Sequence, residues 1–105
     1  MKSKYKNIKV NGFDSKKEYF RALQLNILQK ANEISDLKFQ VKFILIPAFK
    51  ENNKTIEREC SYIADFTYFD KDKNFIIEDV KGYKTEVYKI KRKLMRQQGL
   101  IITEI

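Results

Sequence analysis

The sequence predicts a single α/β domain in which a central mixed β-sheet is flanked by helices, in the order helix, three strands, helix, strand. Two segments carry apolar residues at helical spacing, and four others have the alternation or the β-branched and aromatic content of strands. A chain of 105 residues with 43% hydrophobic content has material for one core and no second. No linker rich in proline or glycine divides it, so residues 1–105 are expected to form one domain.

The first helix is expected to begin at a cap provided by Asp14 or Ser15 and to end near residue 33. Glu18 completes a capping box with Ser15. An ideal helix places Glu18 roughly opposite the main apolar stripe, on the side of Ala22 and Leu25. The stripe itself, expected to face the core, is Phe20, Leu23, Ile27, Ala31 and Ile34.

The following segment alternates between apolar and polar residues, which predicts a half-buried strand that stops at Pro47. Its core-facing residues are expected to be Leu37, Phe39, Val41, Phe43 and Leu45. Residues 50–57 are expected to form a polar loop. Residues 58–69 and 75–81 predict the second and third strands, paired as a hairpin through the turn DKDKN. The third strand is apolar on both faces, so we expect it to lie centrally in the sheet.

Gly82 ends the third strand, and Thr85 with Glu86 begins a second helix that ends at Gly99. Residues 100–105 predict a closing strand. The buried stripe of this helix is expected to be Val87, Ile90 and Leu94. The basic residues of this helix lie largely off that stripe. With two lysines at the start of the first helix and one that follows Gly82, they are candidate contacts to the phosphate backbone of DNA: Lys16, Lys17, Lys84, Lys89, Arg92, Lys93 and Arg96.

The net charge of +8 is unevenly distributed along the chain. Residues 1–17 carry +5 and residues 81–96 carry +6, whereas the remainder sums to −3. Two basic segments around an acidic middle suggest a polyanion, such as nucleic acid, held around an acidic site. The alternative is a lysine surface that serves only solubility.

Several classes of protein are excluded or disfavoured by composition. The single cysteine, Cys60, allows no intrachain disulfide and suits a reducing compartment. The lysine-rich start has no hydrophobic segment behind it, and the longest apolar run, residues 43–49, is too short to span a bilayer. A soluble, cytoplasmic protein is therefore expected. The absence of histidine excludes His-dependent nucleases and typical zinc sites.

Three residues suggest a metal site. Asp65 lies in the middle of a predicted strand, where a charge is costly unless it is paired or binds a cation. Asp79 and Lys81 share one face of the next strand, because side chains alternate with period two. Two carboxylates on adjacent strands suit Mg²⁺. A lysine beside the ion could orient the attacking water while the ion neutralises charge on a scissile phosphate.

Structural explanations remain open for each of these residues. Asp65 could be paired with Lys81 or Arg58, Asp79 and Lys81 could form a solvated strand end, and Glu18 could serve only as a cap. Glu78 competes with Asp79 as the ligand. A loop of three or five residues would place Asp65 on the face of Asp79, and one of four residues on the face of Glu78. The spacing to Lys81 favours Asp79, with Glu78 on the back face paired with a basic side chain.

At these residues the chain resembles the PD-(D/E)xK nuclease superfamily, with its restriction-endonuclease-like core. The order Glu18, Asp65, Asp79-Val80-Lys81 carries this resemblance. Within that superfamily, FDSKKEYFR, YIADFTYFD and EDVKGYKTEVYKIKRKLM resemble small phage-encoded proteins related to archaeal-type Holliday junction resolvases. The resemblance spans about residues 12–105. One marker is absent, because Ala64 stands where the superfamily's name has proline.

The resemblance implies a homodimer that cuts two strands of branched DNA, encoded by a phage or prophage and acting in the cytoplasm of a bacterial host. It implies Mg²⁺, with Mn²⁺ as a substitute, and neither a small-molecule cofactor nor a membrane. The implied catalytic residues are Glu18, Asp65, Asp79 and Lys81, and the implied metal site is Asp65, Asp79, Val80 and Glu18. The alternatives are a nuclease that nicks other branched or linear DNA, and a DNA-binding module that kept the fold without cleaving.

Overall fold

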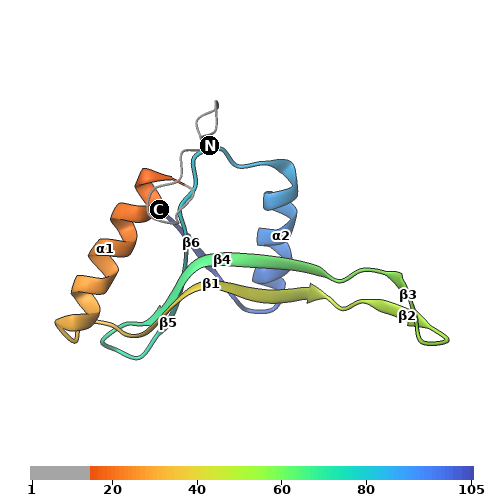
Figure 1. Ribbon diagram of the computed structural model, residues 1–105, viewed down its shortest axis with the longest axis horizontal. Helices are drawn as coiled ribbons and strands as arrows, with labels where there is room; N and C mark the ends of the chain where they lie inside the picture. The colour runs from red at the N-terminus through yellow and green to blue at the C-terminus, as the bar shows by residue number, and fades with distance from the viewer. Residues whose placement is uncertain (1–14) are drawn as a thin grey trace, which may run out of the picture.

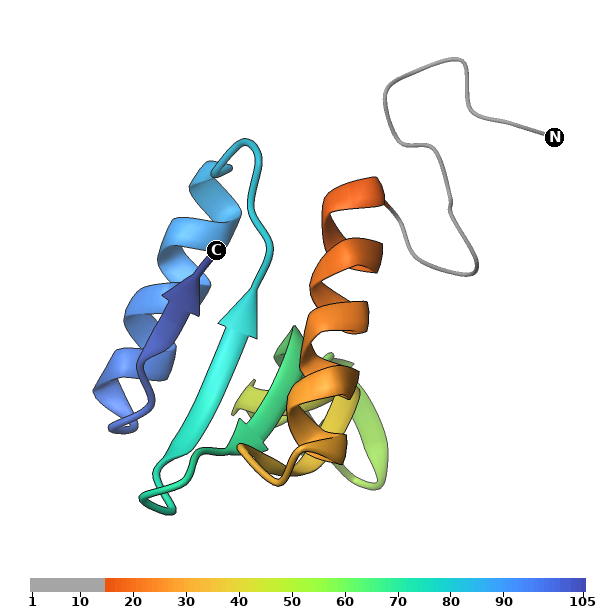
Figure 2. The same cartoon turned by 90° about the vertical axis from the view of Figure 1, so that its left-hand side faces the viewer.

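The structure, a computed structural model, describes residues 15–105 and has a four-stranded sheet at its centre, in the order β1-β4-β5-β6. Its strands are β1 (Ser35–Ile46), β4 (Cys60–Phe69), β5 (Phe75–Asp79) and β6 (Ile102–Glu104). β4 pairs antiparallel with β1 and β5, whereas β6 is parallel to β5. Helices α1 (Lys16–Lys30) and α2 (Glu86–Gln97) lie on opposite sides of the sheet (Figure 2). The predicted α/β class, a mixed sheet between helices, is therefore confirmed, as is the central position of β5.

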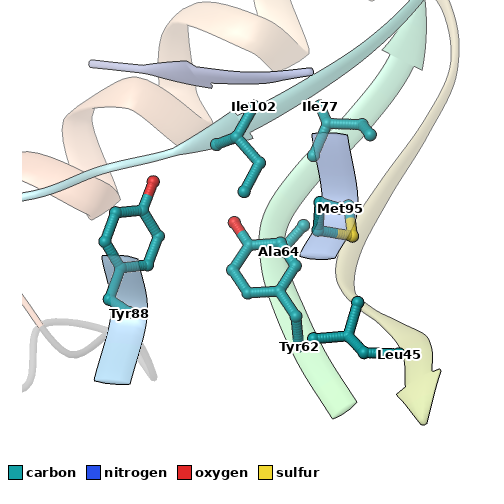
Figure 3. Close-up of a cluster of buried hydrophobic side chains, with 7 residues drawn as sticks. All are labelled: Leu45, Tyr62, Ala64, Ile77, Tyr88, Met95 and Ile102. Atoms are coloured by element: carbon teal, nitrogen blue, oxygen red, sulfur yellow. The ribbon is translucent and has the colours of Figure 1, made fainter. Parts of the chain in front are cut away.

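Two clusters of buried side chains connect the sheet to its helices. The cluster on the side of α2 contains Leu45, Tyr62, Ala64, Ile77, Tyr88, Met95 and Ile102 (Figure 3). The cluster on the side of α1 contains Ala22, Leu25, Ile34, Phe66 and Tyr68. β4 contributes to both, although its even-numbered residues share one side of a regular strand. The long β1–β4 ribbon must therefore bend between Ala64 and Phe66, and Figure 1 shows the two strands curving together. Asp65 lies at this bend.

The ribbon continues into a second hairpin that the sequence did not predict. Residues 50–57 were expected to form a polar loop, but β2 (Phe49–Glu51) and β3 (Lys54–Glu57) pair antiparallel within them (Figure 1). Asn52 and Asn53 connect the strands with φ angles of 52° and 64°. These angles suit the type I′ turn of a two-residue hairpin. Every side chain of these two strands is exposed, so no hydrophobic alternation marks them in the sequence.

Helix α1 begins after Ser15, whose hydroxyl accepts a hydrogen bond from the Glu18 amide at 3.1 Å. Asp14, the alternative cap, and the lysine-rich start of the chain lie outside the described residues. The predicted core stripe is wrong within the helix, because Phe20 is 57% exposed and Ile27 is 66% exposed. The buried residues are instead Glu18, Ala22 and Leu25. Apolar side chains occur on two sides of this helix, so helical spacing alone could not choose the side that packs.

The buried stripe predicted for α2 is also largely wrong. Val87 is 62% exposed and Ile90 is 57% exposed, whereas Tyr88 and Met95 are buried. Leu94 is partly buried against the same cluster. Tyr88 can be buried because its hydroxyl donates a hydrogen bond to Glu104. Neither helix of the described part of the chain is long and apolar enough to cross a membrane.

Candidate active site

Asp65 and Asp79 come together on neighbouring strands. Phe66 pairs with Glu78, and one further step of this register places Asp65 opposite Asp79. The connecting loop has five residues, 70–74, which is one of the two loop lengths expected to place Asp65 on the face of Asp79. The Val80 amide donates to Asp65 Oδ2 at 2.8 Å, and the Tyr62 hydroxyl donates to Asp79 Oδ2 at 2.7 Å.

The proximity of the two acids has an electrostatic consequence. Burial raises the pKa of Asp65 to about 7, together with a hydrogen bond to Asp79 and the charges of Asp79 and Glu18. The hydrogen bond from the Val80 amide acts in the opposite direction. Carboxylates that repel each other in a poorly solvated site are stabilised by a cation or by a shared proton. Such a pair marks a candidate functional site.

Lys81 lies beside the pair. Its Nζ is 3.3 Å from Asp79 Oδ2 and 4.2 Å from the centre of the Tyr88 ring. The Tyr88 hydroxyl in turn donates to Glu104 Oε2 at 2.6 Å. Burial, followed by this bond to Glu104, raises the pKa of Tyr88. The ring is therefore a fixed neutral platform that holds the ammonium group next to Asp79.

Tyr62 supports Asp79 from the other strand. Burial raises the pKa of Tyr62, and the hydrogen bond to Asp79 adds to the effect, so the hydroxyl stays protonated and donates. The rings of Tyr62 and Tyr88 are 6.3 Å apart between centroids, and Figure 3 shows their hydroxyl ends turned in the same direction. The two tyrosines thus pack their rings in the apolar cluster while their hydroxyls bond the carboxylates of Asp79 and Glu104.

Glu78 occupies the opposite face of β5, as predicted. It is 1% exposed and accepts hydrogen bonds from Arg21 on α1 at 2.8 and 2.6 Å and from the Tyr68 hydroxyl. The pairing with a basic side chain is therefore confirmed. The bond to Glu78 raises the pKa of Arg21, while burial and Glu78 raise the pKa of Tyr68 to about 12. This network fixes α1 to the sheet and keeps Glu78 away from Asp65.

Glu18 approaches the acids from α1. Although it begins a helix, it is only 6% exposed, and Gln40 Nε2 donates to its Oε2 at 3.2 Å. Its charge contributes to the raised pKa of Asp65, so it lies near that carboxylate. Of the four predicted catalytic residues, the structure brings Asp65, Asp79 and Lys81 together, and Glu18 is connected to them through Gln40 and through its charge on Asp65. Val80, included in the predicted metal site, contributes its amide to Asp65, and its side chain packs in the cluster beneath α1.

A cleft of about 420 Å³ opens over these residues, between α2 and the β1–β4 ribbon. Its lining includes Asp65, Asp79, Lys81, Tyr62, Tyr88 and Lys91. The cleft therefore combines two acids with two lysines and gives solvent access to the pair Asp65–Asp79.

The cleft offers a metal ion the carboxylate oxygens of Asp65 and Asp79. Among residues 15–105, no group of three or more histidine, cysteine or acidic side chains is arranged to hold a metal ion. Asp65 and Asp79 remain as a pair of oxygen donors whose mutual repulsion a cation would relieve. Mg²⁺ commonly binds through one or two carboxylates and keeps several waters, so this pair fits Mg²⁺ better than a metal that needs a complete protein cage.

The seven residues predicted to contact DNA do not gather at the cleft. Lys84 and Arg92 lie 3.8 and 2.9 Å from carboxylate oxygens of Glu104, and Lys89 lies 3.2 Å from Glu86. Lys93 and Arg96 are exposed on α2, and Lys16 and Lys17 on the first turn of α1. None of these seven is among the described residues that line the cleft.

Lys91, a basic residue of α2 that lines the cleft, was not predicted from the sequence. It lies three residues after Tyr88 and thus beside the buried face of the helix, but the predicted stripe pointed elsewhere. Gln40, Tyr62 and Glu104 were also missed. Glu104 pairs with Asp79 only because β6 is parallel to β5, and no local signal in the sequence shows this.

One protein family matches this chain, over residues 2–102, and it is described as "Protein of unknown function (DUF1064)". No curated protein and no solved structure matches the chain.

Proposed function

The chain belongs to this family of unknown function, and from its cleft we propose that it is a Mg²⁺-dependent DNA endonuclease that hydrolyses phosphodiester bonds. One observation carries the proposal. Asp65 and Asp79 lie opposite each other on adjacent strands, with Lys81 Nζ 3.3 Å from Asp79 Oδ2, in a cleft open to solvent. Paired carboxylates beside a lysine are the groups that metal-assisted phosphodiester hydrolysis needs.

The proposed roles follow from the contacts. Asp65 and Asp79 would hold the ion, each oriented through its Oδ2 by the Val80 amide or the Tyr62 hydroxyl. Within residues 15–105, Glu18 is not part of a direct three-acid group and would complete the site through water. Bound there, Mg²⁺ neutralises the charge that develops on the scissile phosphate. Lys81, held as a cation over the Tyr88 ring, orients the attacking water and stabilises the hydroxide that remains when this water loses its proton to solvent in the open cleft.

The proposed core is that of the PD-(D/E)xK nucleases. The sheet with β6 parallel to β5, and the acids at the end of β5, support this part of the proposal. The proposed substrate is branched DNA, with the four-way junction as the leading candidate, cut symmetrically by a homodimer. This choice of substrate is supported by the +6 charge of residues 81–96, a segment that includes most of α2 beside the cleft. One of these basic residues, Lys91, lines the cleft itself. Contacts to phosphates would recognise shape rather than base sequence.

The test is incubation of the protein with a four-way junction, a flap and a linear duplex, each with Mg²⁺ and with EDTA. Paired symmetric nicks on the junction alone, dependent on Mg²⁺, support a resolvase. Cleavage of every substrate supports a less selective nuclease of the same chemistry. Tight binding without cleavage under any condition would instead indicate a DNA-binding module and would overturn the proposed activity.

A further inference from the structure

Gln40 has an unusual backbone conformation for its place in the sheet. It lies in the middle of β1, yet its φ angle is 54°, in the left-handed region. Asp36 in the same strand also has a positive φ, but there the register shifts between Ser35 and Lys38. At Gln40 the register is unbroken, because Phe39 pairs with Phe66 and Val41 with Ala64. No inserted residue explains the conformation.

The conformation coincides with a polar row across the sheet. The pairs on either side place Gln40 opposite Asp65, which in turn lies opposite Asp79. Asp79 pairs with Glu104 on β6. This row therefore joins one amide and three acids, one from each of the four strands, as neighbours across the sheet. Gln40 also lines the cleft with Asp65 and Asp79.

The side chain of Gln40 links this row to α1. Its Nε2 donates to Glu18 Oε2 at 3.2 Å, and Glu18 is buried beside Asp65. A carboxylate on the first turn of a helix has several rotamers, and a donor from the sheet selects the one that faces the acids. A left-handed residue other than glycine or asparagine is uncommon, and such outliers gather at functional sites.

We propose that Gln40 is a positioning residue of the metal site, whose side-chain amide fixes Glu18 beside Asp65. The inference rests on the proposed function, because it assigns Glu18 to the same ion. The competing explanation is that Gln40 only stabilises the fold. The two explanations make different predictions for Gln40→Gly: a purely structural role would leave the affinity for a metal ion unchanged, whereas a positioning role would weaken it.

The test compares Gln40→Gly with Gln40→Ala and with the wild type. Glycine accepts the positive φ without strain, whereas alanine does not. We expect Gln40→Gly to unfold in EDTA at a temperature no lower than the wild type, and Gln40→Ala to unfold at a lower temperature than Gln40→Gly. Mn²⁺ is the probe of the site, measured by titration calorimetry and by the rise in unfolding temperature that it causes. Removing a partner that orients a ligand weakens metal affinity about 10-fold to 100-fold, and we expect that loss in both variants.

Lys73→Gly is the matched control, because Lys73 also has a positive φ, 68°, but lies in the loop between β4 and β5. It should keep the wild-type affinity for Mn²⁺. If Gln40→Gly binds Mn²⁺ as tightly as the wild type, the inference is wrong while the proposed function stands. If the wild type itself binds no Mn²⁺, or if Asp65→Asn does not weaken the binding, the proposed metal site and the inference fail together.

Discussion

Asp65 and Asp79 face each other across the β4–β5 pair, each held by its own donor, the Val80 amide for Asp65 and the Tyr62 hydroxyl for Asp79. Lys81, two residues after Asp79, closes the arrangement. Burial and the neighbouring carboxylate together raise the pKa of Asp65 to about 7, so the pair is poised to exchange a proton for a cation near neutral pH.

The first prediction concerns catalysis. Asp65→Asn removes a charged ligand and should abolish cleavage of a four-way junction in Mg²⁺, while binding of the junction in Ca²⁺ or EDTA survives. Lys81→Ala should lower the single-turnover rate about 10²-fold to 10³-fold, the range for loss of a positioned group that stabilises developing charge. Asp72→Asn, in the exposed loop before β5, is the control and should cleave normally. A fully active Lys81→Ala enzyme would overturn the assignment of this site.

The second prediction concerns pH. In the metal-free protein the pKa of Asp65 is raised to about 7 from 3.8, so between these values the folded state holds a proton that the unfolded state releases. The free energy of unfolding should therefore fall as the pH rises through this window. The chain has no histidine, the residue whose unperturbed pKa lies between about pH 5 and pH 8, so no histidine contributes to the slope in this window.

Urea unfolding in EDTA at several pH values checks this expectation. Asp65→Asn cannot titrate and should show a flatter profile than the wild type between about pH 5 and pH 8. Identical profiles for the two proteins would contradict the raised pKa. Adding Mg²⁺ to the wild type should reduce the loss of stability at the upper end, because the ion binds the deprotonated pair.

The third prediction concerns Arg21 and Glu78, which join α1 to the back face of β5. Arg21→Ala would leave the Glu78 carboxylate buried with only Tyr68 as a partner. Breaking a fully buried ion pair lowers the free energy of unfolding by about 3–5 kcal/mol. Because 23% of the Arg21 side chain is exposed and solvent screens the pair in part, we expect a smaller loss of about 2–3 kcal/mol. Lys38→Ala, which removes an exposed pair with Asp36 at 3.9 Å, should change it by less than about 0.5 kcal/mol.

A double replacement separates lost charge from lost packing. Arg21→Met with Glu78→Leu removes both charges and keeps apolar volume, so most of the stability lost in Arg21→Ala should return. Chemical denaturation measures all of these variants. If Arg21→Ala proves as stable as Lys38→Ala, the network does not anchor α1 to the sheet.

The fourth prediction concerns Lys91. Lys84, just before α2, and Lys89 and Arg92 on it lie near acids of this chain, whereas Lys91 lines the cleft. Lys91→Met should therefore weaken junction binding and lower the slope of log affinity against log salt by about 1, as expected for one lost phosphate contact. Lys30→Met, an exposed cation at the end of α1, should leave both quantities unchanged. Equal slopes for Lys91→Met and the wild type would remove Lys91 from the DNA contacts.

The sequence by itself determined the order of the main elements and the place of the acids on them. Period-two alternation decided that Asp79 and Lys81 share a face and that Glu78 does not, because this follows from the geometry of any regular strand. The turn left the length of the β4–β5 loop open, and the five residues found in the structure place Asp65 opposite Asp79. The hairpin β2–β3 escaped prediction because its side chains are all exposed and leave no hydrophobic pattern.

Only the tertiary structure decided which sides of the helices are buried. Both helices carry apolar residues on more than one side, and the choice depends on the partner surface rather than on helical spacing. That choice buried Glu18 with Ala22 and Leu25, and it brought Lys91 to the cleft. The structure alone also placed Gln40 and Glu104 in the row with the acids, since strand order and register join residues that are distant in the chain. The acids could be found by local periodicity, whereas the residues that hold them depend on contacts across the sheet.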